Sequence, residues 1–148
     1  MHRIIAAFTL VEALISLLFI GIASAIAVPS YCFLHKKYQA MIARQQLVRV
    51  IRFARRQAIS YQQHVIMRGD PRWTNGYRVS AAHKVLRRFS SQIKQGELVW
   101  NAFPQSEYLQ FSPNGMTYQQ NGSFSYYLQG QLQWKLVVNK AGRVRFEA

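Results

Sequence analysis

Two arginines near the end of the chain are the side chains best suited to binding a ligand. They lie in the run Lys140-Ala141-Gly142-Arg143-Val144-Arg145. In an extended strand alternate side chains share a face, so Arg143 and Arg145 would project together, about 6.6 Å apart at ~3.3 Å per residue. Each guanidinium can hold a phosphate through a forked pair of hydrogen bonds. This spacing predicts a phosphate-binding patch, with Val144 and Phe146 facing the domain.

Further basic residues could widen this patch. Lys135 and Lys140 lie in the same stretch, and a second basic cluster comprises Lys84, Arg87, Arg88 and Lys94. Because Arg87 and Arg88 are adjacent, they would face opposite sides of a strand, and only one of them can share a given surface. The alternative is an edge strand whose charged residues face solvent and prevent aggregation.

The charge of the whole chain favours an anionic partner. Its 19 Lys and Arg residues against 5 Asp and Glu residues give a net charge of +14 in 148 residues. Such an excess attracts polyanions. The candidate partners are nucleic acid, anionic lipid and lipopolysaccharide. A nucleic acid such as DNA would be bound mainly through its phosphate backbone, with weak sequence preference.

The sequence contains no pattern of catalytic residues. Acid–base catalysis needs convergent groups, but the carboxylates that follow the apolar N-terminal segment are scattered: Asp70, Glu97, Glu107 and Glu147. The four histidines have no metal-ligand spacing, and the single cysteine, Cys32, excludes an internal disulfide. We predict no enzymatic activity, no metal and no cofactor.

Hydrophobic periodicity predicts one long helix followed by short strands. Apolar residues at helical spacing continue to about Ser60 on one face: Leu47, Val50, Ile51, Ala54 and Ala58. After Tyr61, β-prone runs alternate with turn signals. The predicted strands are His64–Met67, Tyr77–Ala82, Val85–Phe89, Leu98–Trp100, Tyr108–Phe111, Phe124–Leu128, Leu132–Val138 and Arg143–Phe146. This pattern predicts an α+β fold, with a long N-terminal helix packed on a small antiparallel β-sheet domain.

The start of the predicted helix, residues 8–28, is about the length of a membrane span. It contains a carboxylate, Glu12, near its beginning. A charge in a membrane segment is costly and points to a function. The alternative is a secretory signal cleaved near Ala25 or Ala27, which would release a cationic protein, but Glu12 interrupts the apolar region that such a signal needs.

The segment Phe8-Thr9-Leu10-Val11-Glu12, after a short leader with Arg3, resembles the N-terminus of a type IV pilin or pseudopilin. The resemblance implies that prepilin peptidase cuts between Ala7 and Phe8, that Phe8 is then N-methylated, and that Glu12 pairs with the terminal amine of a neighbouring subunit. Ala7 stands where the family usually has Gly. The resemblance also implies a kink at Pro29, an inner-membrane helix at 8–28 and a periplasmic domain at 61–148.

Later motifs are similar to those of the GspH/FimT family of minor pilins. They are Leu47–Ala58, Val65-Ile66-Met67, Trp73-x-x-Gly76-Tyr77, Phe111–Gly115 and Val137–Arg145. The ending Gly-Arg-x-Arg is similar to that of the FimT branch, which is associated with DNA capture in natural transformation. We therefore expect a minor type IV pilin that binds DNA during uptake, with other pilin subunits as partners. The alternative is a structural minor pilin, or a GspH-like pseudopilin of type II secretion.

Overall fold

The protein is described by a computed structural model that covers residues 10–91, 93 and 96–147. It divides into two compact units, Met1–Tyr38 and Gln39–Ala148. One helix, α1 (Leu10–Tyr61), begins in the first unit and ends in the second. The predicted start at Phe8 lies outside the described residues, and the predicted end at Ser60 is close to the observed end.

The first unit contains the part of α1 that is suited to a membrane. Leu10–Ala27 is long and apolar enough to cross one, with a mean hydropathy of 2.3. The hydroxyls of Ser16 and Ser24 donate hydrogen bonds to carbonyls four residues earlier, at 2.8 and 2.7 Å. These bonds satisfy polar groups that would be costly to leave unpaired in lipid. α1 is helical through Pro29, and the kink expected there stays a prediction.

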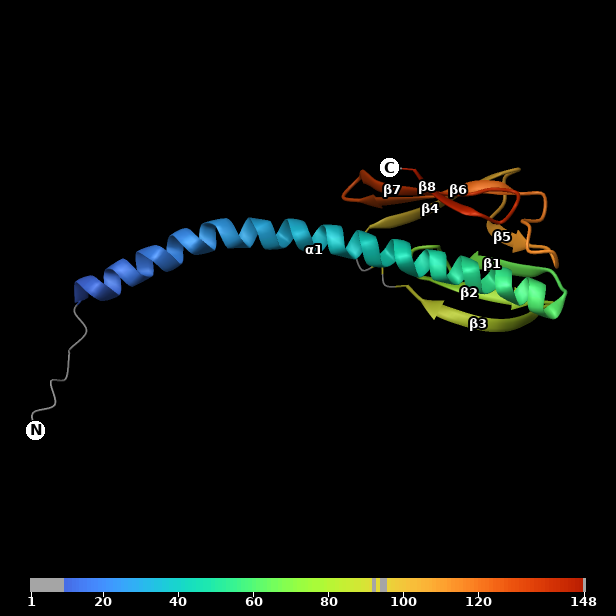
Figure 1. Ribbon diagram of the computed structural model, residues 1–148, viewed down its shortest axis with the longest axis horizontal. Coiled ribbons are helices and arrows are strands. Elements are labelled where there is room, and N and C mark those ends of the chain that lie inside the picture. Colours follow the sequence, from blue (N-terminus) through green and yellow to red (C-terminus); the bar gives the residue numbers. More distant parts are fainter. Residues whose placement is uncertain (1–9, 92, 94–95, 148) are drawn as a thin grey trace, which may run out of the picture. The chain divides into compact units, whose positions relative to one another are not determined.

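Among its described residues, the second unit contains the remainder of α1 and eight antiparallel strands (Figure 1). The strands are β1 (Val65–Gly69), β2 (Gly76–Ala81), β3 (Lys84–Ser90), β4 (Glu97–Phe103), β5 (Tyr108–Phe111), β6 (Asn121–Leu128), β7 (Gln131–Val138) and β8 (Val144–Glu147). Each predicted strand has a counterpart. The largest difference is in β4, whose predicted core Leu98–Trp100 is extended at both ends.

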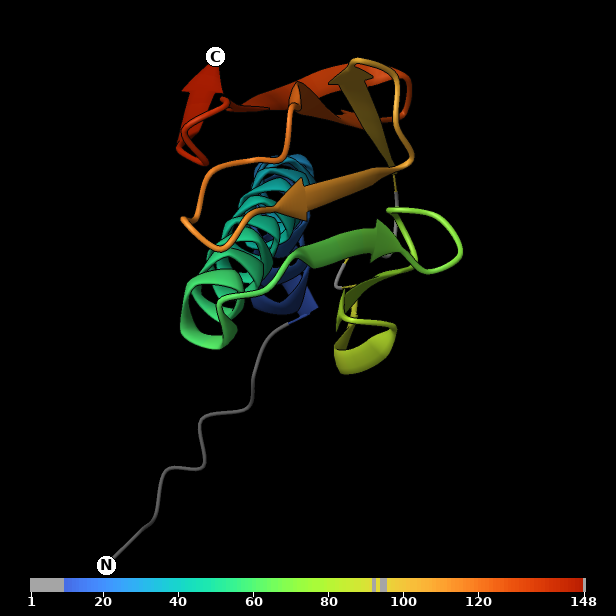
Figure 2. The same ribbon diagram turned by 90° about the vertical axis from the view of Figure 1, so that its right-hand side faces the viewer.

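The strands of the predicted antiparallel β-sheet domain form two sheets. One sheet has the order β3-β2-β1-β5 and the other has the order β4-β6-β7-β8. The pairs β1·β5 and β4·β6 join strands that are not neighbours in sequence, with Val65 opposite Phe111 and Trp100 opposite Phe124. Such pairs depend on the tertiary fold, because turn signals specify only local hairpins. Figure 2 shows both sheets beside the C-terminal half of α1.

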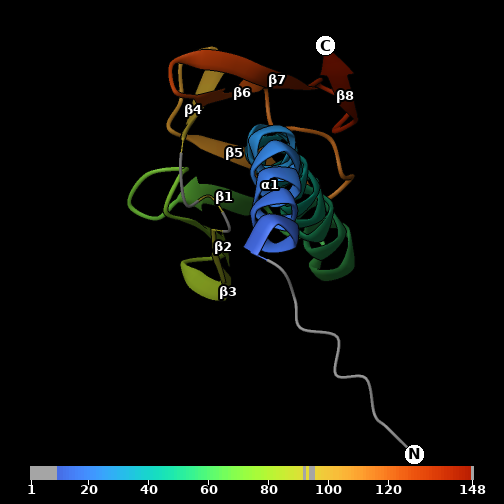
Figure 3. The same ribbon diagram turned by 90° about the vertical axis from the view of Figure 1, so that its left-hand side faces the viewer.

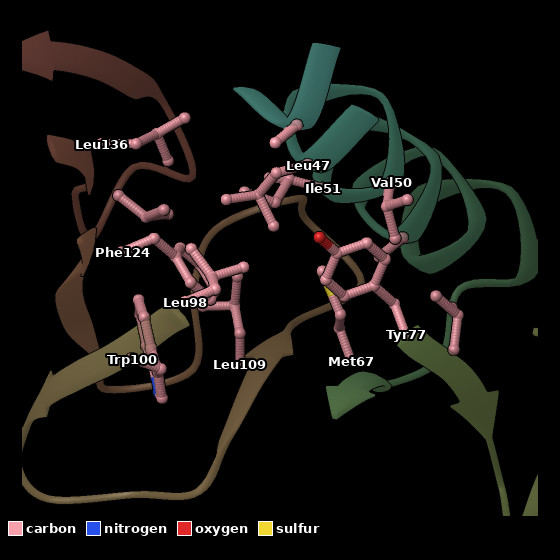
Figure 4. Close-up of a cluster of buried hydrophobic side chains, with 14 of the residues drawn as sticks. Leu47, Val50, Ile51, Met67, Tyr77, Leu98, Trp100, Leu109, Phe124 and Leu136 are labelled. Carbon is pink, nitrogen blue, oxygen red and sulfur yellow. The ribbon is translucent and has the colours of Figure 1, made fainter. Parts of the chain in front are cut away.

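The core lies between α1 and the two sheets. The five helix residues predicted to form its apolar face are all buried: Leu47, Val50, Ile51, Ala54 and Ala58. Leu136 and Phe124 approach this face from one sheet, and Met67 and Tyr77 approach it from the other (Figure 4). The indole Nε1 of Trp134 donates a 2.9 Å hydrogen bond to the carbonyl of Ala40, joining β7 to the start of the domain's helix. The predicted α+β class is confirmed.

Candidate functional site

The turn between β7 and β8 holds the predicted arginine pair in a defined backbone conformation. Asn139 Oδ1 accepts a 2.9 Å hydrogen bond from the backbone N–H of Arg143, and the Asn139 carbonyl accepts one of 2.9 Å from Gly142. The Asn139 N–H donates in turn to the Arg143 carbonyl at 3.1 Å. Gly142 has a φ of +69°, a region that favours glycine. These hydrogen bonds therefore hold the backbone of Arg143 in a defined position at the end of the turn.

This turn also packs on a second loop, which α1 holds in place. The Thr117 N–H donates a 3.0 Å hydrogen bond to the carbonyl of Lys140. Two residues earlier, the Gly115 carbonyl accepts a 2.9 Å hydrogen bond from Arg55 Nε on the helix. A Cβ added at Gly142 would collide with that same carbonyl oxygen. Sequence reasoning missed the positioning roles of Arg55 and Thr117, since neither lies near the turn in sequence.

The register of β8 places Arg145 on the outer side of its sheet. Arg145 lies opposite Val137, whereas Phe146 lies opposite the buried Leu136 on the side that faces α1. Arg143 and Arg145 are both exposed. Val144, Arg145 and Phe146 therefore alternate along β8, whereas Arg143 lies in the turn just before the strand. Phe146 faces the helix side but is 45% exposed, so it is not part of the core.

The two lysines of the predicted patch differ in their surroundings. Lys140 is an exposed residue of the turn. Lys135 Nζ instead lies 2.9 Å from Glu147 Oε2, because β7 and β8 place these residues opposite each other. This ion pair offsets the charge of Lys135. Sequence reasoning missed the pair because it needs the register of the two strands.

The second basic cluster does not extend the C-terminal patch. Arg87 and Arg88 lie on β3, an edge strand of the other sheet, opposite Val79 and Arg78 respectively. Figures 1 and 3 show β3 and β8 on opposite sides of the domain. The guanidinium of Arg87 stacks over the ring of Phe53 at 5.8 Å. Lys94 lies outside the described residues.

The residues assigned to processing and assembly lie at the start of the chain. Ala7 and Phe8 are outside the described residues. Glu12 lies in the first turn of α1, with its side chain exposed. Among the described residues, no group of three or more His, Cys, Asp or Glu side chains could hold a metal ion.

Comparisons with known proteins agree with this architecture. The family described as Type II transport protein GspH matches residues 43–142, more than half of the chain. The fold is similar to the type IV minor pilin FimU of Pseudomonas aeruginosa in two crystal forms, with TM-scores of 0.61 and 0.59 and 21% identity in each case. These matches cover 73% of this chain and 87% and 92% of the FimU chains. No curated protein sequence matches the chain.

These matches concern structural subunits of filaments, in agreement with the prediction that the protein is not an enzyme. Two findings assign the chain to a family. One is the sequence match over most of the domain, and the other is a fold in which a long N-terminal helix packs on antiparallel sheets. The chain belongs to the GspH family of minor pilins and pseudopilins.

Proposed function

We propose that this protein is a minor subunit of a type IV pilus or of a related pseudopilus. Prepilin peptidase would remove residues 1–7, and residues 8–28 would hold the subunit in the inner membrane with domain 61–148 in the periplasm. The family match at residues 43–142 carries the proposal. The FimU-like fold and the apolar segment Leu10–Ala27 support it.

Glu12 is the proposed assembly residue. An unpaired carboxylate in an apolar membrane segment is costly, because lipid does not solvate its charge. An N-terminal amine on a neighbouring subunit would offset that cost by pairing with the carboxylate. The cost of the charge in lipid would then favour movement of the subunit from the membrane into the filament, where the pair forms.

The test is a Glu12→Gln variant, which keeps the size of the side chain and removes its charge. We expect normal membrane levels but little of this variant in sheared filaments, measured by immunoblot of both fractions. Ser16→Ala, one helical turn further on, is the matched control and should assemble normally. Normal incorporation of Glu12→Gln would rule out the proposed role of this charge.

DNA binding is a second proposed function, carried by the geometry of the C-terminal turn. The comparisons favour the filament role and do not bear on DNA. Support for DNA comes from the exposed side chains of Arg143, in the turn, and of Arg145, two residues later on β8. The hydrogen bonds of Asn139 fix the backbone of Arg143 before any ligand arrives. A preset pair of guanidiniums is suited to adjacent phosphates, with little ordering cost on binding.

The test is titration of fluorescent duplex DNA with the full chain in neutral detergent at several salt concentrations. The variant Arg143→Gln/Arg145→Gln should bind more weakly, and its log–log salt slope should shrink by about 2, since each phosphate contact contributes about 0.9. The control Arg72→Gln/Lys84→Gln removes the same charge from exposed positions elsewhere. Equal effects of the two double variants would assign the affinity to overall charge and refute a site at the turn.

A further inference from the structure

An open groove of about 680 Å³ lies on the outer face of α1, within the second unit. Its floor is formed by helix residues between Arg44 and Gln57, and Phe146 of β8 forms one side. The strand that carries Arg145 on its outer face thus presents Phe146 to the groove from its inner face. Figure 1 shows β8 on one side of α1 and β3 on the other.

Three exposed arginines line this groove along a single helical stripe. Arg49, Arg52 and Arg56 follow one another at intervals of three and four residues, so their side chains are neighbours on the helix surface. Like charges at this spacing repel each other. The sequence places no Asp or Glu between Glu12 and Asp70 to offset them. An anionic ligand in the groove would relieve this repulsion.

Aromatic rings lie beside the arginines. The guanidinium of Arg44 lies 4.8 Å from the centre of the Phe146 ring, which is 45% exposed. Phe53, half-buried in the groove, contacts the guanidinium of Arg87 and the ring of Phe89 on β3, at 5.8 and 5.4 Å. Cations and exposed rings in one groove are the features with which proteins bind single-stranded nucleic acid, because phosphates pair with the cations and bases stack on the rings.

We propose that this groove binds a segment of single-stranded nucleic acid that continues from the C-terminal patch. Arg49, Arg52 and Arg56 contact the phosphates, and Phe146 stacks on a base. A duplex conceals the faces of its bases within the stack, so the aromatic contact selects for the single strand. The inference rests on the proposed DNA-binding function and extends it from the outer face of β8 to the helix surface beside it.

The test compares binding of a single-stranded oligonucleotide, a duplex of the same sequence and polyglutamate, all with the full chain in neutral detergent. The groove variant is Arg49→Gln/Arg52→Gln/Arg56→Gln. Its control, Arg68→Gln/Arg72→Gln/Lys84→Gln, removes equal charge from exposed residues that do not line the groove. We expect the groove variant to reduce the salt slope on the single strand by about 2, at about 0.7 for each contact, and the control to leave it nearly unchanged.

Phe146→Leu tests the aromatic contact separately, because it keeps an apolar side chain in β8. We expect it to weaken single-strand binding about fivefold or more and to leave duplex and polyglutamate binding unchanged. Far-ultraviolet circular dichroism and the thermal unfolding midpoint verify that each variant is folded. The double variant Arg143→Gln/Arg145→Gln is measured in parallel.

The outcomes separate this inference from the proposal on which it rests. If only the C-terminal double variant weakens binding, DNA binding at the turn stands and the groove proposal is overturned. If neither variant differs from its control, both proposals fail. If the groove variant loses oligonucleotide and polyglutamate alike while Phe146→Leu changes neither, the groove accepts acidic protein segments, and the nucleic-acid proposal is overturned.

Discussion

Substitution of Gly142 by alanine tests whether close packing of two loops positions Arg143. Gly142 has a φ of +69°, and a Cβ there would collide with the carbonyl oxygen of Gly115. That carbonyl is the acceptor of the 2.9 Å hydrogen bond from Arg55 Nε. The added methyl group must therefore displace the loop from the helix, or displace the turn that carries Arg143.

The expected loss in the free energy of unfolding of Gly142→Ala has two parts, which a control variant can separate. A non-glycine residue in the left-handed region costs about 1 to 2 kcal/mol. Loss of a hydrogen bond with a charged donor adds about 2 kcal/mol. Gly130 has a similar φ of +76° but open space around its Cβ position. Gly130→Ala should therefore show only the first part, and Gly142→Ala should be more destabilising by about 2 kcal/mol.

The assay is urea unfolding of the full chain in neutral detergent, followed by tryptophan fluorescence. The three tryptophans of the chain, Trp73, Trp100 and Trp134, all lie in the second unit and report on the domain. Gly142→Ala should also lower the thermal midpoint by about 4 °C or more for each kcal/mol lost.

A double-mutant cycle identifies the cause of the larger cost. In an Arg55→Gln background the hydrogen bond to Gly115 is already absent, so Gly142→Ala should cost less there than in the native chain. Two results would refute the reasoning: equal losses for Gly142→Ala and Gly130→Ala, or strict additivity of Gly142→Ala with Arg55→Gln.

Three further predictions each concern a single side chain: Tyr77, Trp134 and Glu147. Burial raises the pKa of the Tyr77 hydroxyl from 10.0 to about 12. Between pH 10 and pH 12 the folded state therefore keeps the hydroxyl proton that the unfolded state loses. The free energy of unfolding should fall by about 2 kcal/mol as pH rises through this range. Tyr77→Phe should lack this component of alkaline destabilisation in urea titrations across that range, and an unchanged pH profile would exclude Tyr77 as its source. Trp134→Phe removes the hydrogen bond to the Ala40 carbonyl and should cost about 1 kcal/mol or more in urea unfolding; an unaltered midpoint would show that this bond contributes nothing. Glu147→Gln releases Lys135 from its ion pair and should tighten DNA binding and steepen the salt slope by up to about 0.9, whereas an identical slope would place Lys135 off the DNA path.

The existence of most elements could be predicted from the sequence because their signals are local. The apolar stripe that includes Leu47 and Ala58 follows from the 3.6-residue period of a helix, and those residues are buried. The alternation of Val144, Arg145 and Phe146 likewise follows from the period of a strand, and the register of β8 agrees with it. Cysteine count, charge and the position of Glu12 are properties of the chain itself.

The division into two sheets could not be predicted in this way. Pairing of β1 with β5 and of β4 with β6 joins strands that are distant in sequence. Turn residues specify hairpins between neighbours, and they carry no information about which distant edge a strand will meet. The sequence therefore predicted the antiparallel β-sheet domain but not its division into two sheets.

The charge of +14, the apolar segment with its single carboxylate, the family motifs and the arginine pair were determined by sequence alone, because each depends on residue type or short-range spacing. Only the tertiary structure decided which cations act together. It paired Lys135 with Glu147, separated Arg87 from Arg143, and brought Phe146 beside Arg44 on the helix. Side-chain proximity across strands and between strand and helix depends on register and packing, which arise from the simultaneous burial of apolar faces contributed by the whole domain.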